Sequence, residues 1–282
     1  MKQTILITGT SSGFGKLTAL TLANAGHNVI AAMRDISTKN KEVAGELSAI
    51  SNIEVVEMDI TNDESVNDSI NQILLKYDRI DVLVNNAGVS ASGVLEAYSI
   101  DQIKRLFDAN VFGVFRTYKA VLPSMRKNKS GLIINISSGL GMFSLPKIAP
   151  YSASKFAVEA ITEGINDELK PFGIENVSVQ AGAYPTDIMK KAGVFADDQA
   201  ITQSYTDQYG PQSENSLAVM IAKMKEFNMN PQIIADGILR LVQMEKGTRP
   251  QQFPLDAVAQ GADQEFIDMR NELKLKWLSN HR

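Results

Sequence analysis

Cysteine is absent from this 282-residue chain, and histidine occurs only as His27 and His281. Without a thiol, the protein can form no disulfide bond, no thiolate metal site and no cysteine nucleophile. With only two histidines, a histidine metal cluster is not expected either. We therefore predict no metal site.

An excess of positive charge and long apolar runs are also missing. Lysine and arginine total 28 against 32 aspartates and glutamates, which gives a formal net charge of −4. This balance argues against nucleic acid or an anionic membrane as a partner, so any anion site must be built locally. No apolar run approaches the ~20 residues that span a membrane, and the first residues lack a secretory pattern. We therefore expect a soluble, cytoplasmic protein.

The residues that are present predict a well-packed α/β protein. Hydrophobic residues make up 44% and charged residues 21% of the chain. Short apolar runs alternate with helical segments, at residues 4–7, 28–32, 53–58, 80–84, 132–136 and 176–180. Strands that alternate with helices predict a parallel, doubly wound sheet, the Rossmann fold, in a single domain that spans residues 1–282.

Two segments near the C-terminus depart from this alternation. Residues 187–231 mix polar residues with scattered large apolar ones, and we predict a substrate lid there, with a plain surface insertion as the alternative. The large residues of this segment include Met189, Phe195, Tyr205, Met220 and Met224. A helix at 233–244 and a short strand at 253–255 lead into a tail of about 256–282. Its amphipathic helix is expected to cover the core or a partner subunit, through Phe266, Ile267, Leu273, Leu275 and Trp277.

A glycine-rich turn follows the first predicted strand directly. Gly9, Gly13 and Gly15 precede a helical segment at 16–25. A strand, a glycine turn and a helix form the unit that places a pyrophosphate at a helix N-terminus. The spacing is not G-x-G-x-x-G, and no Gly-Lys-Ser/Thr ending supports a P-loop. A dinucleotide site is therefore predicted, with an ordinary turn as the alternative.

The tip of the second strand bears on which dinucleotide would bind. An acidic side chain there would bond the ribose hydroxyls and disfavour a 2′-phosphate. Met33 stands at that place and Arg34 follows it, and a guanidinium suits a 2′-phosphate through charge-assisted hydrogen bonds. Asp35 leaves an alternative open, because a one-residue shift in register would make it the ribose ligand. The pattern favours NADP(H) over NAD(H).

Polar residues also follow the third and fourth strands. Asp59 could accept from an adenine amino group or cap the helix near Thr61. Residues 85–88, Asn-Asn-Ala-Gly, end the fourth strand, where open α/β sheets bind ligands. Asn110 lies in a long predicted helix at 101–120 and is interpreted from its apolar surroundings as a structural amide.

Three side chains around the fifth strand predict acid–base chemistry. Tyr151 and Lys155 are four residues apart at the start of a predicted helix, so both lie on one face. A neighbouring cation lowers the pKa of a tyrosine and makes it a usable general acid or base. Ser138 comes directly after the strand. An ordinary solvated pair is the alternative for the tyrosine and lysine taken alone.

In this order the motifs resemble the classical short-chain dehydrogenase/reductase family, over about residues 3–260. The residues that carry the resemblance are Thr8, Gly9, Gly13, Gly15, Asp59, Asn85, Asn86, Ala87, Gly88, Asn110, Ser138, Tyr151 and Lys155. The chain departs from the family at Ala181-Gly182, where Pro-Gly is usual. The long tail after Pro250 is similar to the hydroxysteroid-dehydrogenase-like and carbonyl reductase subgroup.

The resemblance implies hydride transfer between a nicotinamide and a carbonyl or alcohol carbon. Tyr151 is then the general acid or base, and Ser138 holds the reacting oxygen. Lys155 lowers the tyrosine pKa and binds the nicotinamide ribose, and Asn110 anchors a water that links Lys155 to solvent. The cofactor-binding residues implied are Gly9, Ser11, Ser12, Gly13, Phe14, Gly15, Arg34, Asp59, Ile60, Asn86, Ala87, Gly88, Asn110, Tyr151, Lys155 and Thr186.

The leading functional prediction is NADP(H)-dependent reduction of a ketone or aldehyde on a small apolar substrate. Leu140, Met142 and Phe143 suggest an apolar pocket beside the predicted lid, although such side chains also pack against sheets. The alternatives are an NAD-dependent secondary-alcohol or hydroxysteroid dehydrogenase and a non-catalytic dinucleotide sensor. A homo-oligomer of two or four subunits is left open.

Overall fold

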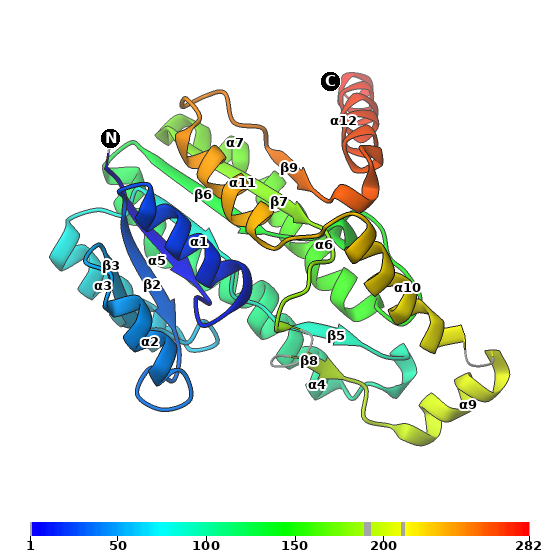
Figure 1. Cartoon of the computed structure of the whole chain (residues 1–282). Coiled ribbons are helices and arrows are strands. Elements are labelled where there is room, and N and C mark those ends of the chain that lie inside the picture. The colour runs from blue at the N-terminus through cyan, green and yellow to red at the C-terminus, as the bar shows by residue number, and fades with distance from the viewer. Residues whose placement is uncertain (1, 189–192, 210–211, 282) are drawn as a thin grey trace.

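The computed structural model describes residues 2–188, 193–209 and 212–281, and its centre is a seven-stranded parallel sheet (Figure 1). The strand order β3-β2-β1-β4-β6-β7-β9 places β1 and β4 at the middle, where the direction of winding reverses. The strands are β1 Thr4–Thr8, β2 Asn28–Met33, β3 Ile53–Glu57, β4 Val82–Asn85, β6 Gly131–Ile136, β7 Ile174–Ala181 and β9 Gln252–Leu255. This confirms the predicted doubly wound α/β fold.

Helices cover both faces of the sheet because successive strand side chains point to opposite sides. In β1, Ile5 and Ile7 pack into one apolar cluster and Leu6 into the other. The first cluster lies under α1 (Gly13–Asn24), α2 (Lys41–Ser48) and α11 (Gln232–Gln243). The second lies under α3 (Asp63–Tyr77), α5 (Gly113–Lys127) and α6 (Ala149–Gly164), with α7 (Asn166–Leu169) completing it. No helix of the described residues is long and apolar enough to cross a membrane.

The single helix predicted at 101–120 is interrupted. Helix α4 (Ile100–Phe107) leads into a π-helical turn at Asp108–Phe112, and α5 begins at Gly113. The start of α4 is held by a capping box between Ser99 and Gln102, in which each residue satisfies a backbone donor of the other. A π-turn inserts one extra residue into the helix, and such turns are frequent at functional sites. Periodicity in the sequence did not reveal it.

The lid segment contains more regular structure than the sequence predicted. Strand β8 (Gly193–Phe195) pairs in parallel with β5 (Ser90–Ser92), and helices α9 (Gln199–Tyr209) and α10 (Gln212–Glu226) follow at the edge of the molecule (Figure 1). The Gln102 side chain donates to the Phe195 carbonyl at 2.7 Å, which attaches β8 to α4. Met189 and the side chain of Met220 lie outside the described residues.

The tail helix α12 (Ala262–Asn280) extends away from the body of the protein (Figure 1). Ile267 is its one buried residue among those described. The prediction that this helix covers the core is therefore wrong for most of its apolar residues. The exposed ones from the predicted set are Phe266, Leu273, Leu275 and Trp277.

A buried network of amides connects the centre of the sheet to the helices of the second face. Asn135 of β6 is fully buried; its amide nitrogen donates to the Tyr118 hydroxyl at 2.7 Å and to Thr162 at 2.9 Å, on α5 and α6. Its amide oxygen accepts from Asn85 of β4 at 2.9 Å, and Asn176 of β7 lies 3.2 Å from its nitrogen. One side chain thus fixes three strands and two helices relative to one another.

We expect Asn135→Ala to lower the free energy of unfolding by about 3 kcal/mol, because several buried polar groups lose partners at once. Chemical denaturation of the purified variant measures this. Asn128→Ala, at the exposed end of α5, is the matched control and should change stability far less. Equal effects of the two substitutions would contradict the role given to the network.

Candidate active site

Helix α6 and the end of β6 bring together the three predicted acid–base residues. Tyr151 lies in the first turns of α6, and the Lys155 nitrogen lies 5.8 Å from the centre of its ring. The Ser138 side chain is hydrogen bonded to Tyr151. The Lys155 ammonium is buried and donates to the carbonyl of Ile136 at 2.9 Å. The structure therefore places these side chains at one site, at the carboxyl end of the sheet.

Burial moves the two titrating groups of this site in opposite senses. It raises the pKa of Tyr151 to about 12, against a smaller lowering by the hydrogen bond with Ser138. It lowers the pKa of Lys155 to about 8, against a raising effect of the Glu159 carboxylate. The lowering of the tyrosine pKa that we expected from Lys155 is not found. Burial dominates at Tyr151, and Lys155, with a pKa of about 8, is already neutral at the pH where this phenol would lose its proton.

Asn110 connects the π-turn to the same helix. Its amide donates to the Val89 carbonyl at 2.9 Å and accepts from the Val89 N–H at 2.8 Å. It also donates to the Ser154 hydroxyl at 3.0 Å, and Ser154 donates to the carbonyl of Tyr151 at 2.7 Å. The interpretation of Asn110 as a structural amide is confirmed. Its role with a water stays a prediction.

The glycine turn is shaped by close packing against the end of β4. A Cβ at Gly9, whose φ is +73°, would lie 2.7 Å from Cα of Ala87. A Cβ at Gly15 would lie 2.3 Å from the carbonyl oxygen of Gly9. The Asn86 amide donates to the carbonyls of Thr8 and Gly9 at 2.8 and 3.0 Å. The predicted residues of both segments therefore form one unit, and Gly88 adjoins it because a Cβ there would lie 3.1 Å from the Asn110 amide oxygen.

The start of α1 fits a phosphate group. Ser11 and Ser12 are half-buried in the turn, and the Ser12 side chain does not cap the helix. The first turn of α1 contains no acidic residue, so its backbone N–H groups and the positive end of the helix dipole suit an anion. Thr186 lies beside this turn, since a Cβ at Gly13 would be 3.4 Å from it, and Phe14 packs edge-on against Tyr184.

The tip of β2 presents a cation and no carboxylate from the strand itself. Met33 is buried in the core. The Arg34 side chain is 57% exposed, and its guanidinium lies 3.9 Å from both the Asp35 and the Asp59 carboxylates. Exposed ion pairs at this distance contribute little free energy. A phosphate could therefore displace the two carboxylates and bind the Arg34 guanidinium.

The loop around Arg34 is held from two sides. The Glu57 carboxylate accepts from the backbone N–H groups of Asp35 and Ile36 at 2.7 and 3.0 Å. The Asn40 amide donates to the carbonyl of Arg34 at 2.7 Å. These hydrogen bonds fix the backbone of Arg34, and therefore the base of its side chain, at the edge of the predicted dinucleotide site.

Asp59 takes part in a local turn after β3. Its carboxylate accepts from the N–H and hydroxyl of Thr61 at 2.9 and 2.8 Å. The helix cap itself is Asn62, so a capping role for Asp59 is wrong. Ile60 packs against the start of α5, where a Cβ at Gly113 would lie 2.7 Å from it. Contact of Asp59 and Ile60 with an adenine stays a prediction.

Glu159 and Ser154 are site residues that the sequence analysis missed. Glu159 lies one turn after Lys155 on α6 and is buried. Its carboxylate accepts from the Ser178 hydroxyl at 2.8 Å and the Gln180 amide at 2.9 Å. The i, i+4 spacing from Lys155, which identified the tyrosine, could also have identified this carboxylate.

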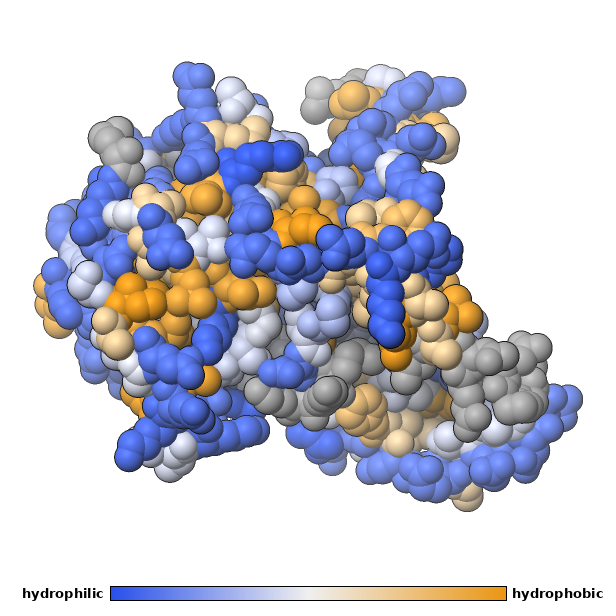
Figure 2. All heavy atoms as spheres, viewed as in Figure 1, coloured by the Kyte–Doolittle hydropathy of each residue, from blue (hydrophilic) through white to orange (hydrophobic). Residues whose placement is uncertain are grey.

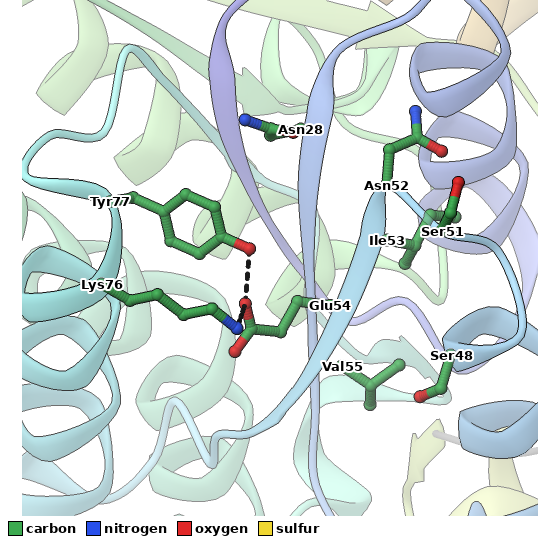
Figure 3. Close-up of a pocket in the computed structure, with 9 residues that line it drawn as sticks. All are labelled: Asn28, Ser48, Ser51, Asn52, Ile53, Glu54, Val55, Lys76 and Tyr77. Atoms are coloured by element: carbon green, nitrogen blue, oxygen red, sulfur yellow. Dashed lines mark hydrogen bonds and ion pairs between the residues drawn. The ribbon is translucent and has the colours of Figure 1, made fainter.

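A hollow of about 310 Å³ at the outer edge of β3 lies away from this chemistry (Figure 3). It is lined from the opposite, amino-terminal ends of β2 and β3 by residues such as Asn28 and Ile53. Its charges already satisfy one another, because Glu54 accepts from Lys76 at 2.8 Å and from the Tyr77 hydroxyl at 2.6 Å. Among the described residues, no group of three or more histidines and carboxylates could hold a metal. We therefore assign the site to α6 and the glycine turn.

The lowered pKa of Lys155 predicts a pH-dependent stability. The folded protein releases this proton near pH 8 and the unfolded chain only near 10.5. Between these values the unfolded state holds more of this proton, so the contribution of Lys155 to the free energy of unfolding rises with pH. Between pH 8 and pH 10 the gain is about 2 kcal/mol. Lys155→Met should remove this gain, as measured by denaturation at several pH values. Identical pH slopes for the two proteins would contradict the assignment.

Comparisons with known proteins agree with this geometry. The family profile of short chain dehydrogenases matches residues 3–195. The 3-ketodihydrosphingosine reductase of Bacteroides thetaiotaomicron is 37% identical over 242 residues, which are 85% of this chain and 83% of that protein. Human retinol dehydrogenase 8 is 32% identical over 259 residues, 88% of this chain and 79% of that protein. The structure of ElxO with NADP bound has a TM-score of 0.72 and 27% identity, and covers 91% of this chain and 98% of that one.

The family match covers more than half of the chain, and the residues that it spans include the glycine turn, the amide segment after β4 and the tyrosine–lysine helix. The chain therefore belongs to the short-chain dehydrogenase family of oxidoreductases.

Proposed function

We propose that this protein is an NADP(H)-dependent reductase that converts the ketone of a largely apolar, long-chain substrate to an alcohol. The observation that carries the proposal is the site formed by the buried Ser138 and Lys155 and the half-buried Tyr151, with Arg34 at the tip of β2. The similarity to a 3-ketodihydrosphingosine reductase supports the substrate class. The similarity to a structure with NADP bound supports the cofactor.

The chain's own residues would hold the cofactor at its two ends. The N-terminus of α1 and the glycine turn suit the pyrophosphate. Arg34 suits the 2′-phosphate, because a guanidinium offers paired donors to phosphate oxygens. Thr186, beside the turn, and Lys155 would hold the nicotinamide end. When bound, the cofactor supplies the hydride.

The pKa of Tyr151 supports the reductive direction. With a pKa raised to about 12, the phenol keeps its proton at neutral pH and is ready to donate it to the oxygen that gains charge during reduction. The hydrogen bond with Ser138 orients the hydroxyl and offers a second donor to that oxygen. Lys155, with a pKa near 8, exchanges its proton close to neutrality and can restore the phenol.

The surroundings of Tyr151 suit an apolar chain. Met142 is buried and Phe143 and Leu145 are exposed on the segment between β6 and α6. From the lid, Val194 and Ala196 pack into the same apolar cluster as Tyr151. Apolar walls with few polar groups bind hydrocarbon and leave the orientation of the ketone to Ser138 and Tyr151.

Cofactor preference tests the role of Arg34. We expect NADPH to bind at least ~10-fold tighter than NADH, a difference of about 1.4 kcal/mol, and Arg34→Ala to abolish the difference by weakening NADPH alone. Titration followed by nicotinamide fluorescence measures both constants. Arg105→Ala, on the exposed surface of α4, serves as the control. Equal or tighter NADH binding by the unmodified protein would favour the NAD-dependent alternative, with Asp35 as the ribose ligand.

Turnover tests the reaction itself. NADPH oxidation should be faster with 3-ketodihydrosphingosine than with a short-chain ketone of the same head structure. Tyr151→Phe should lower turnover at least ~100-fold, as expected for a lost general acid, while leaving NADPH affinity unchanged. Tyr77→Phe, at the distant edge hollow, should retain activity. Full activity of Tyr151→Phe would refute the catalytic assignment, and a preference for short ketones would refute the substrate class.

A further inference from the structure

Helix α12 carries two separate faces, and only one of them contacts the body of the protein. Ile267 is buried, and Arg270 and Lys274 form ion pairs with Glu163 of α6. These residues follow each other at spacings of three and four, so they form one stripe along the helix. The stripe attaches α12 to the C-terminal part of the helix that carries Tyr151.

The second face is apolar and exposed. Phe266, Met269, Leu273 and Trp277 are 44%, 63%, 58% and 59% exposed. Their spacings of three and four place them on one stripe, about 100° around the helix from the stripe that contacts the body. Apolar side chains reach the surface of this projecting helix in Figure 2, which has the same view as Figure 1. The Trp277 ring is partly covered by His281, which stacks on it with 3.9 Å between the ring centres, and the rest of the face is open to water.

The charges of α12 argue against a lipid surface as the partner of this face. Helices that lie on membranes carry a basic polar face. The polar residues of α12 comprise Asp263, Glu265, Asp268 and Glu272 against Arg270, Lys274 and Lys276, which leaves a charge of about −1 with no basic face. Two of the cations are already paired with Glu163.

We propose that the apolar stripe of α12 packs antiparallel against the same stripe of a second copy of this chain. With the two-fold axis near position 271, Met269 faces Leu273 of the second copy and Phe266 faces Trp277 of the second copy. Each pairing matches residues of similar size, as close packing between helices requires. The contact is isologous, so both stripes are covered at once.

Charge complementarity favours the antiparallel direction. Glu265 and Lys276 lie on the same flank of the apolar stripe, and neither has an ion-pair partner within residues 2–188, 193–209 and 212–281. In the antiparallel register, Glu265 of each copy faces Lys276 of the other, which gives two ion pairs. In a parallel pair the same flank of the two copies would lie on opposite sides of the contact, so Glu265 and Lys276 could not pair with each other.

The first test compares two leucines of the same helix. Leu273→Glu places a charge in the stripe, whereas Leu275→Glu places it on the polar side, where the side chain is 68% exposed. The contact between two helices buries less area than the ~1,600 Å² of standard interfaces, so the association is expected to be weak and to depend on concentration. Native mass is therefore measured by light scattering at several protein concentrations. The unmodified protein and Leu275→Glu should reach the mass of the associated form at high concentration. Leu273→Glu should show half of that mass. Circular dichroism and NADPH oxidation control for folding and should be unchanged in both.

The second test addresses the direction of packing. Glu265→Lys and Lys276→Glu should each weaken association, because each puts like charges face to face. An equimolar mixture of the two variants should restore it, since their antiparallel heterodimer has opposite charges at both contacts. Failure of the mixture to recover would overturn the proposed register.

Two other outcomes would overturn the proposal as a whole. One is a mass for Leu273→Glu that equals that of the unmodified protein at every concentration. The other is binding of the unmodified protein to phosphatidylserine vesicles that Leu273→Glu abolishes, since the stripe would then serve a bilayer. Neither result depends on the substrate or cofactor, so the proposal stands or falls separately from the proposed function.

Discussion

The buried amide of Asn135 is the contact on which the geometry of this protein depends most. It lies between strands β4 and β7 and reaches hydroxyls on both α5 and α6. Parallel strands of aliphatic residues can slide and rotate with little change in hydrophobic energy, because that energy has no direction. A set of buried hydrogen bonds does have direction, and it fails if the strands shift. The network holds α6 through Thr162, near the C-terminal end of the helix, and so helps to position the helix that carries Tyr151.

The pKa values of Tyr151 and Lys155 depend on groups that this fixed geometry holds in place. A phenol and an ammonium are both pushed toward their neutral forms by burial. The buried carboxylate of Glu159 opposes that effect at Lys155 from one helical turn away, and it is itself held by side chains of β7. The pKa of Lys155 thus depends on a carboxylate that is itself fixed by hydrogen bonds from the sheet.

Most of the fold could be predicted from the sequence, because strand runs and helix periodicity are local signals. The strands, the glycine turn and the clustering of Ser138 with Tyr151 and Lys155 are confirmed. The π-turn at Asp108–Phe112 could not be predicted, since one inserted residue hardly changes a periodic pattern. The pKa of Tyr151 could not be predicted either. Spacing in the sequence indicates which charged groups are near the phenol, but it does not show that the effect of burial on the pKa exceeds theirs.

The burial of Met33 has a consequence for how cofactor preference can change during evolution. In many dinucleotide sites a carboxylate at the tip of the second strand selects the unphosphorylated ribose. Here that position is a methionine packed in the core beneath α1 and α2. A carboxylate introduced there would first have to leave the core or lie buried without a partner, at a cost of several kcal/mol. A carboxylate at position 33 therefore requires that neighbouring core residues change first, so any change of preference in one substitution must act on the exposed residues after the strand.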